Sequence, residues 1–224
     1  MLFRSRINSA GNFIQLFGFG YSRGKGSSDS QKYNESGEIG YASGACLFTT
    51  KKILDQIGLF DKFLFAYHDD LELGWRARQM GIKSFYIPSS IVHHAESFSF
   101  GWSKKKFFLL ERNRWYCILT HYSKKTLYKL FPSLLVIEIA LLLFYLVKGM
   151  IREKIAGYLD IIKNRKLISQ KRKELEAKKI ISDREIIEQF HDVLDIPPQI
   201  SKGIYSSSFN KLLNILSKII RIII

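Results

Sequence analysis

The most apolar segment of the chain, residues 131–147, lies between two strongly basic stretches. Residues 104–129 contain eight Lys or Arg residues and one acid, and residues 148–179 contain eleven Lys or Arg residues and four acids. A helix of roughly 17–25 apolar residues is long enough to cross a bilayer. The segment therefore predicts a membrane span, a helix that lies on a membrane, or a buried core helix.

The residues within this segment favour the second interpretation. Pro132 and Ser133 suit the start of a helix, which leaves residues 134–147 for its apolar part, and Glu138 lies within that part. A spanning helix usually carries its Lys and Arg excess on one side only, whereas both flanks are basic here. We therefore expect the segment to dip into or lie on an anionic membrane surface, with a buried core helix as the alternative.

The overall composition predicts a folded protein that binds a polyanionic partner. The 224 residues are 46% hydrophobic and carry a formal net charge of +15, which excludes a mainly disordered chain and favours an anionic membrane or a nucleic acid as partner. We expect no nucleic acid, because the basic stretches contain no recognisable binding motif. Cys46 and Cys117 are too few for a disulfide framework. We therefore expect a reducing compartment. The charged start of the chain is unlike a signal peptide, so we do not expect secretion.

Short strands and helices alternate in the first half of the chain, and helices follow. Residues 7–40 are rich in Gly, Ser and Asn and predict hairpins and loops. This order predicts part of an α/β layer with a helical extension, whose charges would form a solvated face or, alternatively, a membrane-contacting arm. After residue 40 we predict strands at 45–48, 83–87 and 91–93. We also predict a helix capped by Thr49 or Thr50 and closed by Gly58, and a helix at 69–79 that stops at Gly81. A basic helix should begin at about Ser103, and a helical tail at about Ile151, with breaks at Pro197–Pro198 and Ser206–Ser208.

The candidate chemistry lies at the start of the helix predicted at 69–79. Asp69, Asp70 and Glu72 bring three carboxylates to its first turn, followed by Trp75 and Arg76. Free N–H groups and the helix dipole stabilise negative charge there, so ordinary structural acids are one interpretation. In the other interpretation, one ionised carboxylate serves as a general base. The spacing alone leaves both open.

Two further features are compatible with a site. His93 and His94 would point to opposite faces of the predicted strand, so one of them can enter a site, although a metal site would need further ligands such as carboxylates. Residues 40–46 form a small-residue turn of the kind that lets backbone approach a ligand closely. A hydrogen-bonded histidine and a plain turn are the alternative interpretations.

Several short motifs follow one another in a fixed order along residues 7–150. They are Ile7-Asn8-Ser9-Ala10-Gly11-Asn12, Arg23-Gly24, Ser43-Gly44-Ala45-Cys46, Gly58-Leu59-Phe60-Asp61, Phe65-Ala66-Tyr67-His68-Asp69-Asp70-Leu71-Glu72-Leu73-Gly74-Trp75-Arg76-Ala77-Arg78, Gly81, Ile87-Pro88, Val92-His93 and Arg112-Asn113-Arg114. In this order and spacing the chain resembles the family 2 inverting glycosyltransferases, in their rhamnosyltransferase-like branch.

The resemblance implies a fold and an activity. The expected fold class is α/β, as the C-terminal half of a Rossmann-like GT-A sandwich followed by a helical, membrane-associated extension. The implied activity is transfer of a sugar from a nucleotide-sugar donor to a glycan or lipid-linked acceptor, with inversion, at the cytoplasmic face of the cell membrane. Residues 1–102 would be the acceptor-side part of the domain, residues 103–150 a basic helix and an apolar membrane-associated helix, and residues 151–224 the charged tail.

The resemblance also implies a general base and a metal ligand. Asp70 takes the position of the aspartate that removes the proton from the acceptor hydroxyl as the oxygen attacks the anomeric carbon. His93 takes the position of a histidine that helps to hold a divalent cation, Mg²⁺ or Mn²⁺. This cation would neutralise charge on the departing diphosphate.

Four neighbouring residues lie within the motif without an assigned role. Asp69 stands where a glutamate is commoner and Glu72 where an aspartate is commoner, so neither is assigned a catalytic role. Trp75 and Arg76 would either pack in the core or position the acceptor.

One part of the family pattern does not occur in this sequence. Family members hold the metal and the diphosphate with an Asp-x-Asp motif in an N-terminal nucleotide-binding half, and this sequence contains no Asp-x-Asp. We therefore expect a C-terminal part that lacks a half of about 100 residues, inactive alone and active with a separate N-terminal half. The alternatives are a non-catalytic module that binds an acceptor or a partner enzyme, and a basic nucleic-acid-binding protein.

Overall fold

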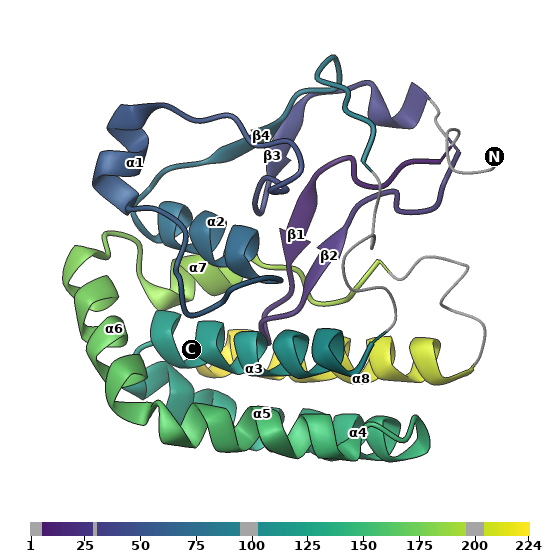
Figure 1. Cartoon of the computed structure of the whole chain (residues 1–224), viewed down its shortest axis with the longest axis vertical. Coiled ribbons are helices and arrows are strands. Elements are labelled where there is room, and N and C mark those ends of the chain that lie inside the picture. The colour runs from purple at the N-terminus through teal and green to yellow at the C-terminus, as the bar shows by residue number, and fades with distance from the viewer. Residues whose placement is uncertain (1–5, 29–30, 95–102, 196–203) are drawn as a thin grey trace.

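The computed structural model describes residues 6–28, 31–94, 103–195 and 204–224 (Figure 1). These residues form a mixed α/β structure that is mostly helical and has small sheets. The strands are β1 (Asn12–Ile14), β2 (Gly20–Ser22), β3 (Gly37–Ile39) and β4 (Ser84–Tyr86), and a 3-10 turn spans Gln31–Tyr33. The α-helices are α1 (Lys51–Ile57), α2 (Asp69–Gln79), α3 (Lys104–His121), α4 (Lys124–Val147), α5 (Ile151–Lys163), α6 (Arg165–Lys178), α7 (Asp183–Gln189) and α8 (Ile204–Ile223).

The strands form two antiparallel pairs, β1 with β2 and β3 with β4. Asn12 links the two pairs, because its carbonyl oxygen accepts the N–H groups of Gly40 (2.8 Å) and Tyr41 (3.2 Å). At the end of β1, Gln15 forms a parallel bridge with His191 near the end of the chain. The α/β class expected from the sequence is therefore confirmed, in the form of short antiparallel strands among many helices.

Two predicted strands are wrong. Residues 45–48 form a turn and coil, with Phe48 95% exposed, and residues 91–93 form exposed coil. Both predictions rested on short apolar runs, but a strand also needs a neighbour that bonds its N–H and C=O groups. The strand predicted at 83–87 is confirmed as β4, which has such a neighbour in β3.

The helices around the candidate site follow the sequence closely. α1 begins after Thr50, whose hydroxyl accepts the N–H of Ile53, and it ends at Gly58 with φ 85°. α2 covers the predicted residues Asp69–Gln79, and Gly81 follows with φ 76°. This left-handed conformation costs glycine little, so glycine is a natural helix terminator.

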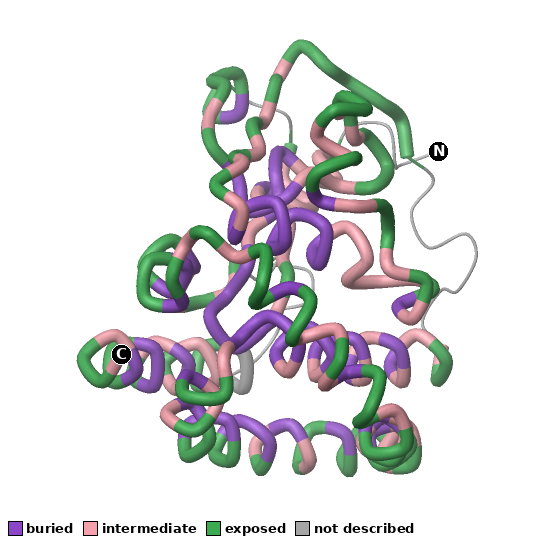
Figure 2. The backbone as a smooth tube through the Cα atoms, turned by 90° about the vertical axis from the view of Figure 1, so that its left-hand side faces the viewer, coloured by how far each residue is buried: buried purple, intermediate pink, exposed green. Residues whose placement is uncertain are grey.

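The remaining helices form the lower part of the molecule in Figure 1. α5 and α6 pack against α3, and α4 packs against α5 and α8. Figure 2 shows buried positions on the sides of the helices that face the interior and exposed positions on the outside. One core runs from the strands through α2 into this helical layer, and it includes Ile14, Leu71, Trp75, Ile118 and Ile137.

α4 begins earlier than the sequence predicts. Ser123 caps it, since its hydroxyl accepts the N–H of Thr126 (3.2 Å), and Pro132 lies inside the helix. Proline has no N–H to give to the carbonyl four residues before it, but that carbonyl belongs to Tyr128, an exposed residue that water can reach. α4 is the one described helix long and apolar enough to cross a membrane by length and composition, and 33% of its apolar stretch is buried in the protein.

The tail folds back onto the rest of the protein. α8 contributes Leu213, Leu216 and Ile220 to the core. Ser206–Ser208 lie within α8 and do not interrupt it, which corrects the predicted break. Weak helix formers near a helix start cost little when later residues bury apolar side chains. The break predicted at Pro197–Pro198 lies outside the described residues.

Candidate active site

The first turn of α2 holds the predicted general base. Asp70 is the second residue of the helix, and its side chain is partly exposed. Its Oδ1 accepts the N–H of Leu71 (2.8 Å), and its Oδ2 accepts the N–H of Gly44 (3.1 Å). Among the described residues Asp70 forms no ion pair. Its two oxygens are thus held by backbone donors alone.

The Gly44 contact joins two motifs that lie far apart in the sequence. Ser43 organises the turn before α1, because its carbonyl accepts the N–H of Cys46 (2.9 Å) and its hydroxyl accepts the N–H of Ala45 (3.3 Å). The turn is exposed, and its backbone approaches Asp70. A small-residue turn was expected to approach a ligand, and the structure shows that it also orients the carboxylate.

The surroundings of Asp70 make it more basic than an ordinary aspartate. The pKa of Asp70 is raised to about 6, with burial as the largest cause and the negative charge of Asp69 acting in the same direction. The N–H groups of Gly44 and Leu71 oppose this rise but are outweighed. The helix dipole, which the position at a helix start predicts as the main influence, would lower the basicity of this carboxylate. Burial dominates instead and gives a carboxyl group that is mostly ionised at pH 7 and close to the pKa that suits a general base.

Glu72 and Arg76 form a buried pair that ties α2 to the end of α1. Arg76 Nη2 lies 2.5 Å from Glu72 Oε2, and its Nε lies 3.1 Å from Glu72 Oε1. The same guanidinium donates to the carbonyls of Ile57 (2.6 Å) and Leu59 (2.9 Å). Four hydrogen bonds from Arg76 thus go to groups of the protein, and this geometry is that of a structural bridge.

Trp75 lies in the centre of the core. Its side chain is fully buried and makes edge-on ring contacts with Tyr122, Phe190 and His121 at centroid distances of 4.9–5.0 Å. Of the two roles left open by the sequence, packing in the core fits this position, because a buried indole cannot reach an acceptor.

His93 lies in exposed coil. Its neighbour His94 makes a 2.9 Å hydrogen bond between Nδ1 and the Asn8 amide. In the part of the chain that the structure describes, no three His, Cys, Asp or Glu side chains gather closely enough to hold a metal ion. The ligand role of His93 stays a prediction.

The loop that leads into α2 has an unusual backbone. Phe65, Tyr67 and His68 all have φ values of 61–63°, a conformation that costs a residue other than glycine of the order of 1–3 kcal/mol. Arg112 and Asn113 of α3 donate hydrogen bonds to the carbonyls of this loop. In the sequence this Arg-Asn pair is only part of a motif. Its contact with the loop joins residues far apart in the chain, so only the tertiary structure shows it.

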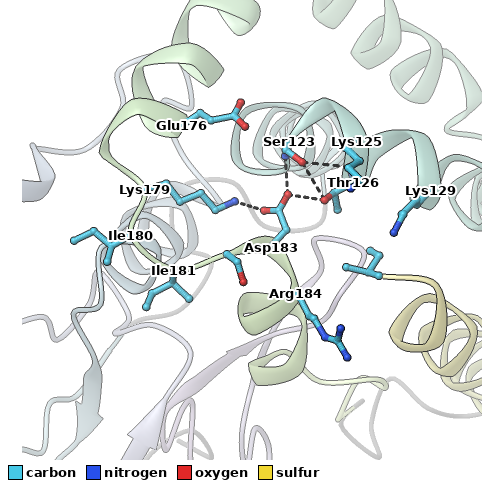
Figure 3. Close-up of a pocket in the computed structure, with 12 residues that line it drawn as sticks. Ser123, Lys125, Thr126, Lys129, Glu176, Lys179, Ile180, Ile181, Asp183 and Arg184 are labelled. Atoms are coloured by element: carbon cyan, nitrogen blue, oxygen red, sulfur yellow. Dashed lines mark hydrogen bonds and ion pairs between the residues drawn. The ribbon is translucent and has the colours of Figure 1, made fainter.

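A pocket of about 430 Å³ lies elsewhere, where α4 and α7 begin (Figure 3). Asp183 closes its polar end: the carboxylate accepts the N–H of Ser123 (2.9 Å) and the hydroxyl of Thr126 (2.6 Å) and pairs with Lys179. A side chain of the protein thus already fills the anion position at the start of α4. The residues predicted for the active site are not among the described residues that line this pocket.

Comparison with known proteins finds a match over the segment that contains the carboxylates. Residues 31–117 match the family model "Glycosyltransferase like family 2", a segment that contains Gly44, Asp70 and Asn113. Over 63 residues the chain is 38% identical to the N-acetylglucosaminyl-diphospho-decaprenol L-rhamnosyltransferases of Mycobacterium tuberculosis strains CDC 1551 / Oshkosh and ATCC 25618 / H37Rv. This match covers 28% of the chain and spans only 20% of the length of each relative. No solved structure matches the chain significantly. Residues 31–117 therefore form a glycosyltransferase family 2-like domain, with a distant, partial similarity to a rhamnosyltransferase.

Proposed function

We propose that this protein transfers a sugar from a nucleotide-sugar donor to a glycan or lipid-linked acceptor, with inversion at the anomeric carbon. The observation that carries the proposal is the placement of Asp70 within the family 2-like segment. Asp70 is partly exposed, held by two backbone N–H groups, and has a pKa raised to about 6 by burial. An L-rhamnosyl donor and a polyprenyl-linked acceptor, as in the names of the relatives, are the first substrates to test.

Asp70 would act as the general base. Each carboxylate oxygen accepts one backbone N–H, which leaves a lone pair on each for an acceptor hydroxyl. As the carboxylate takes the hydroxyl proton, the oxygen forms a bond to the anomeric carbon, and the bond from that carbon to the diphosphate oxygen breaks. The electron pair leaves with the diphosphate, and attack from the opposite side inverts the anomeric centre.

The donor would be held by a nucleotide-binding half that supplies an Asp-x-Asp motif, which this sequence lacks. Mg²⁺ or Mn²⁺ on the donor diphosphate would need ligands from that half, with His93 as one further ligand, because the described residues form no metal cluster. We expect the purified chain alone to show no transfer. Metal-dependent turnover by the chain alone would contradict the need for such a half.

The outward face of the lower helices fits an anionic membrane. Exposed apolar side chains run along α4, among them Phe131, Leu135, Ile139, Leu143 and Val147, and continue on α5 with Ile155, Leu159 and Ile162. Basic residues stand at both ends of this face: Lys124, Lys125, Lys148 and Arg152. Apolar side chains between two basic ends suit a helix lying in the interface of an anionic leaflet.

The opposite face of α4 argues against a span. Glu138 faces inward, where it pairs with Arg114 and with Lys154 (Nζ–Oε2, 2.7 Å) and accepts the Tyr158 hydroxyl. A helix that crossed the bilayer alone would place this acid in hydrocarbon without those partners, at high cost. We therefore propose that the protein rests on the cytoplasmic face of the cell membrane, where lipid-linked acceptors are presented.

The test of the transfer function uses source cells in which the gene carries Asp70→Asn, with Asp55→Asn as control. Asp55 is an exposed α1 carboxylate paired with Lys51. Membranes from these cells are given labelled nucleotide-sugars and lipid-linked acceptors. We expect D70N to lower transfer by about 10²–10⁴-fold and D55N to leave it unchanged. Normal transfer in D70N membranes would refute the role of Asp70.

The exposed turn at residues 43–46, whose backbone approaches the partly exposed Asp70, would also suit a second candidate, a non-catalytic module that binds an acceptor or a partner enzyme. This candidate predicts that the purified chain binds a lipid-linked glycan while transfer in D70N membranes stays normal. Loss of transfer in D70N membranes would exclude it.

A further inference from the structure

We propose that Asn113, a residue of α3 that does not touch Asp70, positions Asp70 by holding the left-handed loop that leads into α2. The functional meaning of this inference rests on the proposed role of Asp70. The structural link itself is measurable without any activity.

The loop cannot hold its shape from its own sequence. Phe65, Tyr67 and His68 have φ values of 63°, 63° and 61°, and bulky L-residues avoid this region. His68 occupies the N-cap position of α2, and its side chain makes no capping hydrogen bond. Such a backbone persists only when surrounding groups over-determine it.

Asn113 supplies those surrounding groups. Its side chain is fully buried, and its Nδ2 lies 3.0, 2.8 and 2.7 Å from the carbonyl oxygens of Leu64, Ala66 and Tyr67. An amide has two N–H bonds, so three acceptors share two hydrogens. The three carbonyls converge on one nitrogen only because the chain reverses its twist at the left-handed residues.

Arg112 fixes which way the Asn113 amide points. Arg112 Nε donates to Asn113 Oδ1 (2.9 Å), so the NH₂ group must face the loop. The Nη2 of Arg112 donates to the carbonyls of Phe63 (2.8 Å) and Leu64 (3.0 Å). Two adjacent side chains of α3 thus bind four successive or near-successive carbonyls before Asp70.

The loop in turn decides where Asp70 lies. Glu72 N donates to the carbonyl of His68 (2.8 Å), which is the first hydrogen bond of α2, so the direction of the chain at His68 sets the start of the helix. Asp70 then reaches Gly44 N at 3.1 Å. If Asn113 no longer donates to the carbonyls of residues 64, 66 and 67, of which Leu64 keeps Arg112 as a donor, we expect the loop to relax, the first turn to fray and Asp70 to leave Gly44.

Two other features of the molecule support an inference less well than the Asn113 contacts. The pocket of Figure 3 has its anion position filled by Asp183, and Cys46 near Gly44 is a single exposed thiol. The Asn113 contacts are specific to one side-chain chemistry. An amide donates hydrogen bonds at this place, whereas leucine of similar size donates none.

The experiment measures Asp70 directly in the purified full-length chain. Protein labelled with ¹³C at aspartate carboxyls and with ¹⁵N is titrated by NMR, and exchange of the Gly44 amide proton is followed. Wild type, Asn113→Leu and a control, Asn210→Leu, are compared. Asn210 is a similar amide that bonds the backbone of Leu194 from α8, remote in sequence from the loop.

The expected result is specific to Asn113. Because burial is the largest cause of the raised pKa of Asp70, a relaxed loop should lower this pKa by about one unit or more, and Gly44 should exchange roughly 10-fold faster or more. N210L should match wild type in both measurements. A folded N113L with unchanged Asp70 titration and Gly44 exchange overturns the proposal.

Two further outcomes are assigned in advance. If N113L does not fold, Asn113→Ala, which lets water reach the same carbonyls, replaces it under the same criteria. If N113L shows the two NMR changes while D70N membranes keep normal transfer, the positioning link stands and the proposed function fails.

Discussion

Asp70 and Glu138 are two carboxylates that their surroundings treat in opposite ways. Asp70 lies at the start of α2, accepts two backbone N–H groups and forms no ion pair within the described residues, and burial raises its pKa to about 6. Glu138 lies on α4 and faces α3 and α5. Burial alone would raise its pKa, but the charges of Arg114 and Lys154 outweigh this and lower the pKa to about 2.

Asp70 remains available to bind a substrate, whereas the contacts of Glu138 are all made within the protein. The oxygens of Glu138 are taken by Arg114, Lys154 and Tyr158, so this acid holds three helices together and has no capacity for a substrate. Asp70 keeps free lone pairs and a pKa near neutrality. Acids with perturbed pKa values can be structural or catalytic. The lowered pKa of Glu138 fits a structural acid, and the raised pKa of Asp70 is what the proposed general base needs.

The largest expected effect on stability comes from Glu138→Gln. The substitution leaves Arg114 and Lys154 buried without their full counter-charge, so we expect the free energy of unfolding to fall by about 3–5 kcal/mol. Urea denaturation at pH 7 measures it. Glu188→Gln is the control, because Glu188 is an exposed acid paired with Arg184 at 3.4 Å. A change below about 1 kcal/mol in E138Q would show that this cluster is not structural.

The same variant gives a test by pH. The folded pKa of Glu138 lies below its unfolded value, so the stability from its ionised form is present above the unfolded pKa and is lost as pH falls toward about 2. The difference in stability between wild type and E138Q should therefore shrink between about pH 4.5 and pH 2. A difference that stays constant across this window would contradict the assigned pKa shift.

Gly74→Ala should disturb the other region, where α2 packs on the strand side. A Cβ at Gly74 would lie 2.2 Å from Tyr41 Cβ and 2.9 Å from Tyr41 Cα. Although alanine favours helices, we expect this overpacking to cost about 1–3 kcal/mol. Gly157→Ala in α5 is a matched control, because its nearest neighbour would be Arg112 N at 3.5 Å. If G74A is as stable as G157A in thermal unfolding, the described close packing of α2 against Tyr41 is wrong.

The sequence predicted the helices α1 and α2 better than it predicted the contacts that these helices make. Thr50, Gly58 and Gly81 mark helix ends by their own chemistry, so the bounds of α1 and α2 could be read from the sequence. The start of α4 could not, because the tolerance of Pro132 depends on which face of the helix meets solvent. The apolar run at 45–48 likewise lacked a strand partner, which is a property of the whole fold.

The candidate site was partly visible in the same way. The carboxylates at the start of α2 were found by spacing, and the Glu72–Arg76 pair follows from their four-residue separation. The contacts of Gly44 and Asn113 with the site region join positions 26 or more residues apart, so no local pattern announces them. The predicted metal role of His93 is untested.

Leu143→Glu tests whether the exposed face of α4, the helix that carries Glu138, binds a membrane. Leu143 lies on the exposed face of α4 (60% exposed), opposite the ion-pair cluster. If this face rests on lipid, a new negative charge should weaken binding to vesicles of phosphatidylcholine and phosphatidylglycerol by about 10-fold or more. Sedimentation with the vesicles measures it. Phe48→Glu is the control, since Phe48 is 95% exposed and lies before α1. Equal binding of L143E and wild type would contradict the proposed membrane face.

The orientation of α4 is tested by the same vesicles. In a Cys46→Ser background, Lys124→Cys and Lys148→Cys place one thiol at each end of the helix, while Cys117 is buried. A helix lying on the outer leaflet leaves both new thiols open to a membrane-impermeant maleimide. Protection of one end only would show that the helix spans the bilayer and that Glu138 leaves its partners.

The smallest expected effect is a gain in stability from Asp70→Asn, opposite in sign to that from E138Q. The folded pKa of Asp70 is raised above its unfolded value, so its ionisation costs stability above about pH 6, and the cost disappears as pH falls below the unfolded pKa. We expect D70N to be more stable than wild type by about 1 kcal/mol at pH 7, as is common when a functional charge is removed, with Asp55→Asn unchanged. Thermal unfolding at pH 7 and pH 4 measures both. A gain at pH 7 that vanishes at pH 4 assigns the cost to the ionised carboxylate, whereas a loss at pH 7 would mean that Asp70, like Glu138, belongs to the structure.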